Sequence, residues 1–185
     1  SSAASDVYKR QGVKSPCDGE LSYRGYNIKD LVTGSKGKRF VFEEGAYLLL
    51  FGELPTDTQL MEFQGRLSDC MELPTNFTRH VIMKAPTSDI MGSMTRSILT
   101  LGSYDKEKES LEIPNVLRQS MQLIAVFPML AVYAYHAYCH YEKNESMYIH
   151  RPEKDLSIAE NFLRLLRPDT KFTELEARVL DIALL

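Results

Sequence analysis

The sequence contains little that would define a disulfide framework or a redox site. Its 185 residues include only three cysteines, and Cys17, Cys70 and Cys139 are far apart and form no CxxC pair. An odd number of widely spaced cysteines is typical of proteins kept in a reducing compartment. We therefore expect a reduced, cytoplasmic protein.

The chain also lacks an excess of positive charge and a long apolar segment. Its 22 Lys and Arg residues stand against 25 Asp and Glu residues, which gives a net charge of −3. Neither nucleic acid nor an anionic membrane surface is therefore expected as a partner. No apolar run approaches the ~20 residues that span a bilayer, and no signal-peptide core is present. Apolar residues make up 44% of the chain, enough for the core of one domain or of a piece of a larger protein.

Residues 1–11 differ in character from the rest of the chain. They show no hydrophobic period and no helix cap, and residues 6–11, DVYKRQ, resemble translated sequencing-adapter DNA. We therefore expect residues 1–11 to be a non-native artefact and residues 12–185 to form the helical domain. The chain begins on Ser1 and ends on leucines within a predicted helix, which predicts truncation at both ends.

What the sequence does contain is a series of helix start and stop signals. Residues 42–56 read FEEGAYLLLFGELPT, an apolar run followed by Gly52, which suits the left-handed position after a helix end. Thr56 and Gln59 then form a predicted capping box for the next helix. Because residues 46–51 are apolar nearly all round, we expect other elements to enclose that helix. Further helices are predicted near residues 57–70, 77–82, 89–103, 114–141, 158–167 and 174–185.

Strand signals are confined to the N-terminal part of the chain. Leu21 and Tyr23 alternate with polar neighbours as in a brief strand, and Asn27 can cap a short helix that ends at Gly34. The basic stretch 34–39, GSKGKR, lacks the spacing of a phosphate-binding loop and is predicted to be solvated. The fold class is therefore all-α and multi-helical, with a short β/turn segment near the N-terminus.

The predicted helix 114–141 is apolar on more than one face. Pro114 suits its first turn, and Pro128 inside it predicts a kink. The breadth of its apolar surface predicts neighbours on several sides, within the subunit or across a subunit boundary. The predicted helix 89–103 presents one apolar face, made of Met91, Met94, Ile98 and Leu101.

Candidate chemical groups are few. His136 and His140 are four residues apart on a helix, the spacing at which two imidazoles can share a metal ion. They lack a third ligand and a glutamate base between them, so a packed or interfacial surface is the favoured interpretation. His80 and His150 stand alone in the sequence.

The remaining nucleophile and acid candidates are also weak. Cys139 precedes His140 directly, and adjacent residues of a helix point apart. The acidic pairs Glu43–Glu44 and Glu174/Glu176 fit first turns of helices, where negative charge is stabilised. We therefore predict no catalytic, cofactor-binding or metal-binding residue in this chain.

Three segments nevertheless resemble one family. Residues 21–28, LSYRGYNI, and residues 42–56 are similar to the N-terminal part of citrate synthase, and residues 156–163, LSIAENFL, to a later segment. The resemblance covers residues 17–185 in the family's order. Residues 88–91, SDIM, and 149–152, IHRP, look like the citrate synthases of clostridia-like bacteria.

This resemblance implies a helical dimeric enzyme that condenses acetyl-CoA with oxaloacetate to give citrate and CoA. In the family, one histidine polarises the oxaloacetate carbonyl, while another histidine and an aspartate enolise acetyl-CoA. The resemblance places all three after residue 185, so the chain alone is expected to be inactive. No covalently bound cofactor and no metal are implied. The helices near 88–103 and 114–141 look like two that pair across the family's dimer interface.

Two alternatives remain open at this point. A 2-methylcitrate synthase would use propionyl-CoA, and the residues present do not include the acyl pocket that would decide between the two. A non-catalytic helical scaffold or binding module is favoured if the natural gene ends at Leu185. The downstream coding sequence discriminates among the three.

Overall fold

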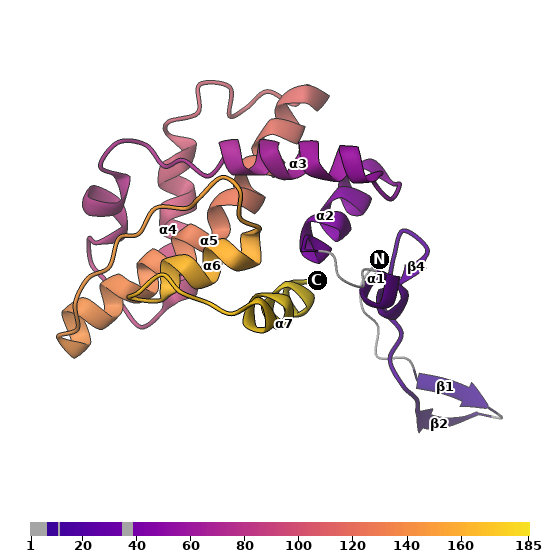
Figure 1. The fold of residues 1–185 in the computed structure, drawn as a ribbon. Coiled ribbons are helices and arrows are strands. Elements are labelled where there is room, and N and C mark those ends of the chain that lie inside the picture. The colour runs from indigo at the N-terminus through magenta and orange to yellow at the C-terminus, as the bar shows by residue number, and fades with distance from the viewer. Residues whose placement is uncertain (1–6, 11, 35–38) are drawn as a thin grey trace.

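The computed structural model describes residues 7–10, 12–34 and 39–185, and helices dominate this part of the chain (Figure 1). Most of the basic stretch 34–39 falls outside the described residues. In chain order the elements are β1 (Val7–Arg10), β2 (Val13–Pro16), β3 (Ser22–Tyr23), β4 (Tyr26–Asn27), α1 (Ile28–Gly34), α2 (Val41–Phe51), α3 (Asp57–Asp69), the π-helical turn η1 (Thr78–Ile82), α4 (Ile90–Gly102), α5 (Ile113–Lys143), α6 (Ile158–Leu166) and α7 (Glu174–Leu184). The predicted fold class is confirmed.

Strands occur only at the N-terminal end of the described residues, in two antiparallel hairpins. β1 pairs with β2, with Val7 opposite Pro16, and β3 pairs with β4, with Tyr23 opposite Tyr26. The β1–β2 hairpin projects away from the helices (Figure 1). β1 lies within residues 1–11, and the non-native origin of that segment stays a prediction.

The predicted helix boundaries around α2 and α3 are confirmed. Gly52 has φ +83° and donates its backbone N–H to Leu48 O at 2.8 Å, which ends α2. Thr56 and Gln59 form the capping box of α3, with both reciprocal hydrogen bonds present. The expected enclosure of α2 is only partly correct. Leu48 is fully buried, but Leu49 and Phe51 are exposed, because α2 packs on its neighbours mainly through its other side.

The segment before α4 differs from the sequence-based expectation. The helix predicted around residues 77–82 is a single π-helical turn with Phe77 and Ile82 buried. Asp89 caps α4 by accepting a hydrogen bond from Gly92 N at 3.0 Å. Met91 does not share the inner face of α4, since its side chain is 74% exposed.

α5 is the central element of the helical body, next to α3, α4, α6 and η1 (Figure 1). It begins with proline in its first turn, as predicted, and runs through Pro128 as one helix, where the kink stays a prediction. Among the described residues, α5 is the one helix that is long and apolar enough to cross a bilayer, judged by length and composition alone. A core helix of a soluble protein passes the same test, and Ala125, Val126 and Leu130 of α5 are buried against other helices.

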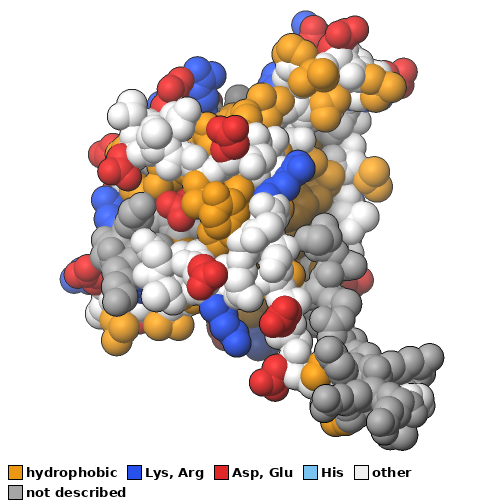
Figure 2. Space-filling model, turned by 90° about the vertical axis from the view of Figure 1, so that its right-hand side faces the viewer, with side chains coloured by type: hydrophobic (Ala, Val, Ile, Leu, Met, Phe, Trp, Pro, Cys, Tyr) orange, Lys and Arg blue, Asp and Glu red, His pale blue; other side chains and the backbone are white. Residues whose placement is uncertain are grey.

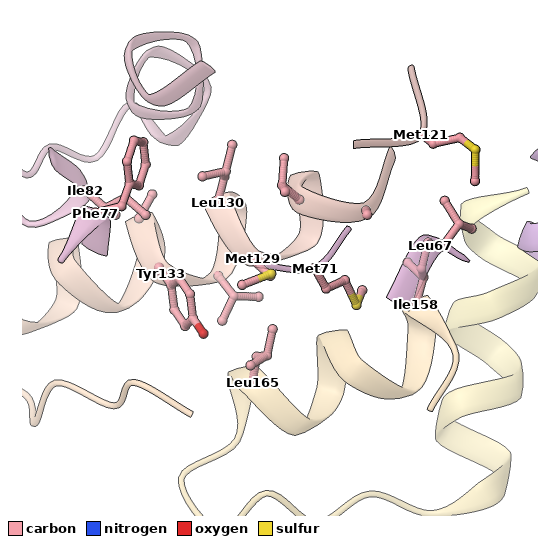
Figure 3. Packing of buried hydrophobic residues seen from close by; sticks show 14 of the residues in the cluster. Leu67, Met71, Phe77, Ile82, Met121, Met129, Leu130, Tyr133, Ile158 and Leu165 are labelled. Carbon is pink, nitrogen blue, oxygen red and sulfur yellow. The ribbon is translucent and has the colours of Figure 1, made fainter. Parts of the chain in front are cut away.

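The hydrophobic core forms around α5. Figure 3 shows Leu130 near Phe77 and Ile82 on one side of this helix, with Met129 and Tyr133 facing Leu165 of α6 on the other. Leu67 of α3 and Ile158 of α6 extend the same cluster (Figure 3). α5 therefore packs on more than one face, in agreement with its broad apolar pattern.

The core can be tested with two positions on α3. Leu67 is 2% exposed, whereas Met61 on the same helix is 56% exposed. We expect Leu67→Ala to lower the free energy of unfolding by about 2–5 kcal/mol, because a buried side chain is replaced by a cavity. Met61→Ala is the matched control and should change it by less than about 0.5 kcal/mol. Urea denaturation measures both, and equal effects would contradict the assigned core.

Candidate functional site

Asp181 of α7 caps a helix far away in the sequence. Its Oδ2 accepts a hydrogen bond from Val41 N and its Oδ1 accepts one from Phe42 N, each at 2.9 Å. These are the first two residues of α2, and Phe40 before them provides no side-chain cap. Since the first N–H groups of a helix have no partner within it, the Asp181 carboxylate satisfies two of them.

Glu43 of α2 makes the corresponding contact with α6. Its Oε1 accepts a hydrogen bond from Ile158 N at 2.8 Å, next to the capping box formed by Ser157 and Glu160. Glu43 is 1% exposed and Asp181 is 2% exposed. The Glu43 Oε2 atom has no hydrogen-bond partner among the described residues. α6 and α7 also pack against each other, so the two carboxylates and this contact join three helices in a closed ring.

Burial controls the protonation of both carboxyl groups. It raises the pKa of Glu43 to about 8, and the nearby Asp181 acts in the same direction against the hydrogen bond from Ile158. Burial also raises the pKa of Asp181 above its ordinary value, while the hydrogen bonds from Phe42 and Val41 act to lower it. Glu43 is therefore mainly protonated at neutral pH, which avoids two adjacent buried charges.

This carboxyl pair is not arranged for acid–base chemistry on a substrate. A catalytic acid must reach the reacting atom within hydrogen-bond distance, and neither Glu43 nor Asp181 has access to the surface. The pair instead determines how α2, α6 and α7 are placed relative to one another. It is a structural site.

A separate apolar groove of about 430 Å³ lies between α2, α4, α5, α6 and α7. Phe42, Leu123, Phe127, Phe162 and Leu184 are among its lining residues, and none of the charged side chains that the structure describes lines it. Sites that orient small ligands combine apolar walls with a few polar groups, so this groove is better suited to apolar side chains of a polypeptide. Figure 2 shows that hydrophobic side chains also reach the surface in several patches, between charged groups of both signs.

The structure gives each of the two paired histidines a backbone partner. His136 is buried and its Nε2–H donates to Leu165 O at 3.0 Å. His140 donates from Nδ1 to Glu145 O at 2.7 Å. Within the described ranges, no three His, Cys, Asp or Glu side chains form a group that could hold a metal ion. These contacts favour the packing interpretation of the pair.

The other candidates are not brought together into a catalytic arrangement. Cys139 is buried, whereas His80 is exposed in the middle of the η1 turn. The His150 ring stacks on Tyr148 with centroids 5.9 Å apart, and the His150 carbonyl accepts a hydrogen bond from the Tyr133 hydroxyl. Glu176 completes the capping box of α7 and pairs with Arg167.

The roles of Glu43 and Asp181 do not follow from the sequence pattern. The pattern predicts Glu43 only as a first-turn acid and does not single out Asp181. The available signal was a carboxylate on the apolar face of a helix. Asp181 lies four residues after the buried Ala177, and Glu43 lies on the same face as Ala46 and Tyr47.

The raised pKa of Glu43 predicts a stability that falls as pH rises. Between about pH 5 and pH 8 the folded chain keeps the Glu43 proton that the unfolded chain releases, so each pH unit lowers the free energy of unfolding. In Glu43→Gln this contribution disappears, because the amide still accepts from Ile158 N and carries no titrating proton. In this variant the slope of the free energy of unfolding against pH should become shallower by about 1.4 kcal/mol per pH unit.

Urea denaturation at several pH values measures this slope. Glu44→Gln is the control, since Glu44 is adjacent on α2 and only partly buried, and it should keep the wild-type slope. An unchanged slope in Glu43→Gln would show that Glu43 does not hold its proton in the folded chain.

Several solved structures that resemble this arrangement of helices are citrate synthases. The citrate synthase from Pyrobaculum aerophilum superposes with a TM-score of 0.73 at 25% identity, over 89% of this chain and 40% of that one. The enzyme from Thermoplasma acidophilum gives a TM-score of 0.73 at 21% identity, which shows the fold.

Sequence relatives agree with the structures. The chain is 30% identical over 149 residues to a citrate synthase of Corynebacterium glutamicum, covering 80% of this chain and 32% of that protein. It is 31% identical over 166 residues to a 2-methylcitrate synthase of Shewanella oneidensis, covering 89% of this chain and 40% of that protein. The chain thus spans 32% and 40% of the lengths of these two relatives. The family model described as citrate synthase, C-terminal domain, matches residues 2–185. The chain therefore belongs to the citrate synthase family.

Proposed function

We propose that this chain is part of a citrate synthase that condenses acetyl-CoA with oxaloacetate to give citrate and CoA. The observation that carries this proposal is the family match along residues 2–185, supported by a citrate synthase relative at 30% identity. The citrate synthase from Thermoplasma acidophilum is described in a ternary complex with oxaloacetate itself and carboxymethyl coenzyme A, which is an analogue of acetyl-CoA. Both substrates are small molecules, and the reaction requires no metal.

The groups that carry out this chemistry are proposed to lie in the remainder of the full-length protein. Enolisation of acetyl-CoA needs a base at its methyl group, and carbon–carbon bond formation needs a donor at the oxaloacetate carbonyl. Within the described residues, the buried carboxyl pair and the backbone-bonded histidines are not positioned for either role. In this proposal, the 185 residues provide the helical support on which the reacting groups are mounted.

A second candidate is 2-methylcitrate synthase, which would use propionyl-CoA. The observation in its favour is the relative from Shewanella oneidensis, 31% identical over 89% of this chain. The two substrates differ by one methylene in the acyl group, a difference worth only about 1–3 kcal/mol in an apolar pocket. Support from relatives is comparable for both, so the choice depends on the acyl pocket of the complete enzyme.

We further propose that the protein is a homodimer in which α4 and α5 pair with their copies. The supporting observation is a row of exposed apolar side chains along α5, Val116, Leu123 and Phe127, at helical spacings of seven and four residues. Met91 and Leu99 on α4 are exposed as well. Apolar side chains in this arrangement are typical of surfaces that another polypeptide covers.

The activity is tested by assaying CoA release with oxaloacetate and either acetyl-CoA or propionyl-CoA. We expect the full-length protein to release CoA with a higher kcat/KM for acetyl-CoA, and the 185-residue chain alone to release none. A preference for propionyl-CoA would favour the 2-methylcitrate synthase assignment. A full-length protein inactive with both thioesters would favour the scaffold interpretation, and activity of the 185-residue chain would contradict the proposed location of the reacting groups.

The dimer is tested by placing a charge on the exposed face of α5. Phe127 is 43% exposed, and Phe127→Glu should raise the dimer dissociation constant at least about tenfold, because a charge would lose its water in the interface. Met61→Glu, on the exposed surface of α3, is the matched control and should leave it unchanged. Sedimentation velocity gives both constants, and a monomeric wild type at micromolar concentration would contradict the proposal.

A further inference from the structure

The last turn of α7 is held to α2 and β3 by contacts of three kinds. Asp181 binds the two N-terminal amides of α2, one helical turn before Leu185. A Cβ atom placed on Gly45 of α2 would lie 2.3 Å from Leu185 Cδ1, so the Leu185 side chain occupies the space that a larger residue at position 45 would need. The Tyr23 hydroxyl of β3 donates to Leu185 O at 2.6 Å.

These contacts act on only one end and one side of the helix. Leu175 and Val179, on the earlier turns of α7, are exposed. The C-terminal end of α7 lies next to α2 in Figure 1. Because a short helix moves as a rigid unit, the Asp181 contacts and the packing of α7 on α6 together set the position and direction of α7.

We infer that Asp181 is a positioning residue for the condensation reaction, because it fixes the placement of α7 in the helical support of the reacting groups. This inference rests on the proposed function, in which the reacting groups lie outside the 185 residues. Asp181 is 2% exposed and acts through the helices that it joins. It holds α7 on α2, and so places α7 relative to the α2–α6 body.

A residue that only stabilises the fold would not need hydrogen bonds to a helix so distant in the sequence. A local cap, such as the hydroxyl of Thr56 at the start of α3, satisfies an amide three residues away and leaves the position of other helices unaffected. Asp181 instead satisfies amides 139 and 140 residues away, on a different helix. Loss of the Thr56 cap therefore costs stability alone, whereas loss of the Asp181 cap also lets α7 shift along α2.

The experiment compares Asp181→Asn with Thr56→Ala in the full-length enzyme, using acetyl-CoA and oxaloacetate. In Asp181→Asn one of the two oxygens is replaced by an NH₂ group that cannot accept from an α2 amide. We expect kcat to fall about 10–100-fold, since a displacement of ~1 Å at the reacting groups has that effect. KM for oxaloacetate should stay within about threefold, because a loss confined to the transition state lowers kcat and kcat/KM together.

Thr56→Ala removes only the local N-cap of α3. It should lower the unfolding temperature and keep the wild-type kcat. Asp181→Glu is the second variant, since it keeps the charge and both acceptors but lengthens the side chain by one methylene. It should also lower kcat.

A wild-type kcat in a folded Asp181 variant would overturn the inference, and so would failure of both variants to fold, which would make Asp181 a stability residue only. An inactive wild-type enzyme would instead show that the proposed function itself had failed.

Discussion

The arrangement of this protein depends on two carboxyl groups that cap helices to which they are not connected in sequence. Asp181 of α7 binds the N-terminus of α2, and Glu43 of α2 binds the N-terminus of α6. Two of the three helices thus cap the start of another, and packing of α6 on α7 closes the ring. Since both carboxyl groups are buried, a shift of any one helix would leave a polar group without its partner in an apolar surrounding, which is costly.

The ring has an electrostatic cost that the protein reduces by holding a proton. Two ionised carboxylates in a buried site would repel each other and would each lose hydration. The raised pKa of Glu43 leaves that group neutral at pH 7, so Asp181 can carry the negative charge that suits the positive end of α2. The hydrophobic core around α5 provides most of the burial, and the carboxyl ring determines the relative position of the helices that surround it.

Much of the local structure could be predicted from the sequence. The capping box at Thr56 occurs where its spacing predicted it, as does the left-handed Gly52. These features are local, since each depends on hydrogen bonds between residues at most four positions apart. The exposure of Met91 and the π-helical turn at η1 were not predicted, because both depend on which neighbours pack against the segment.

At the candidate site, the difference between what local sequence predicts and what packing decides is larger. Glu43 and Asp181 have unremarkable local sequences, and nothing in them indicates which amides they bind. Only the packing of α2, α6 and α7 brings partners 115 to 140 residues apart into hydrogen-bond distance. The sequence by itself determined the helices, their ends and the family resemblance, since these follow from spacing and residue type. The tertiary structure decided which acidic groups are buried and what they hold together, because burial and long-range capping are properties of the packed chain.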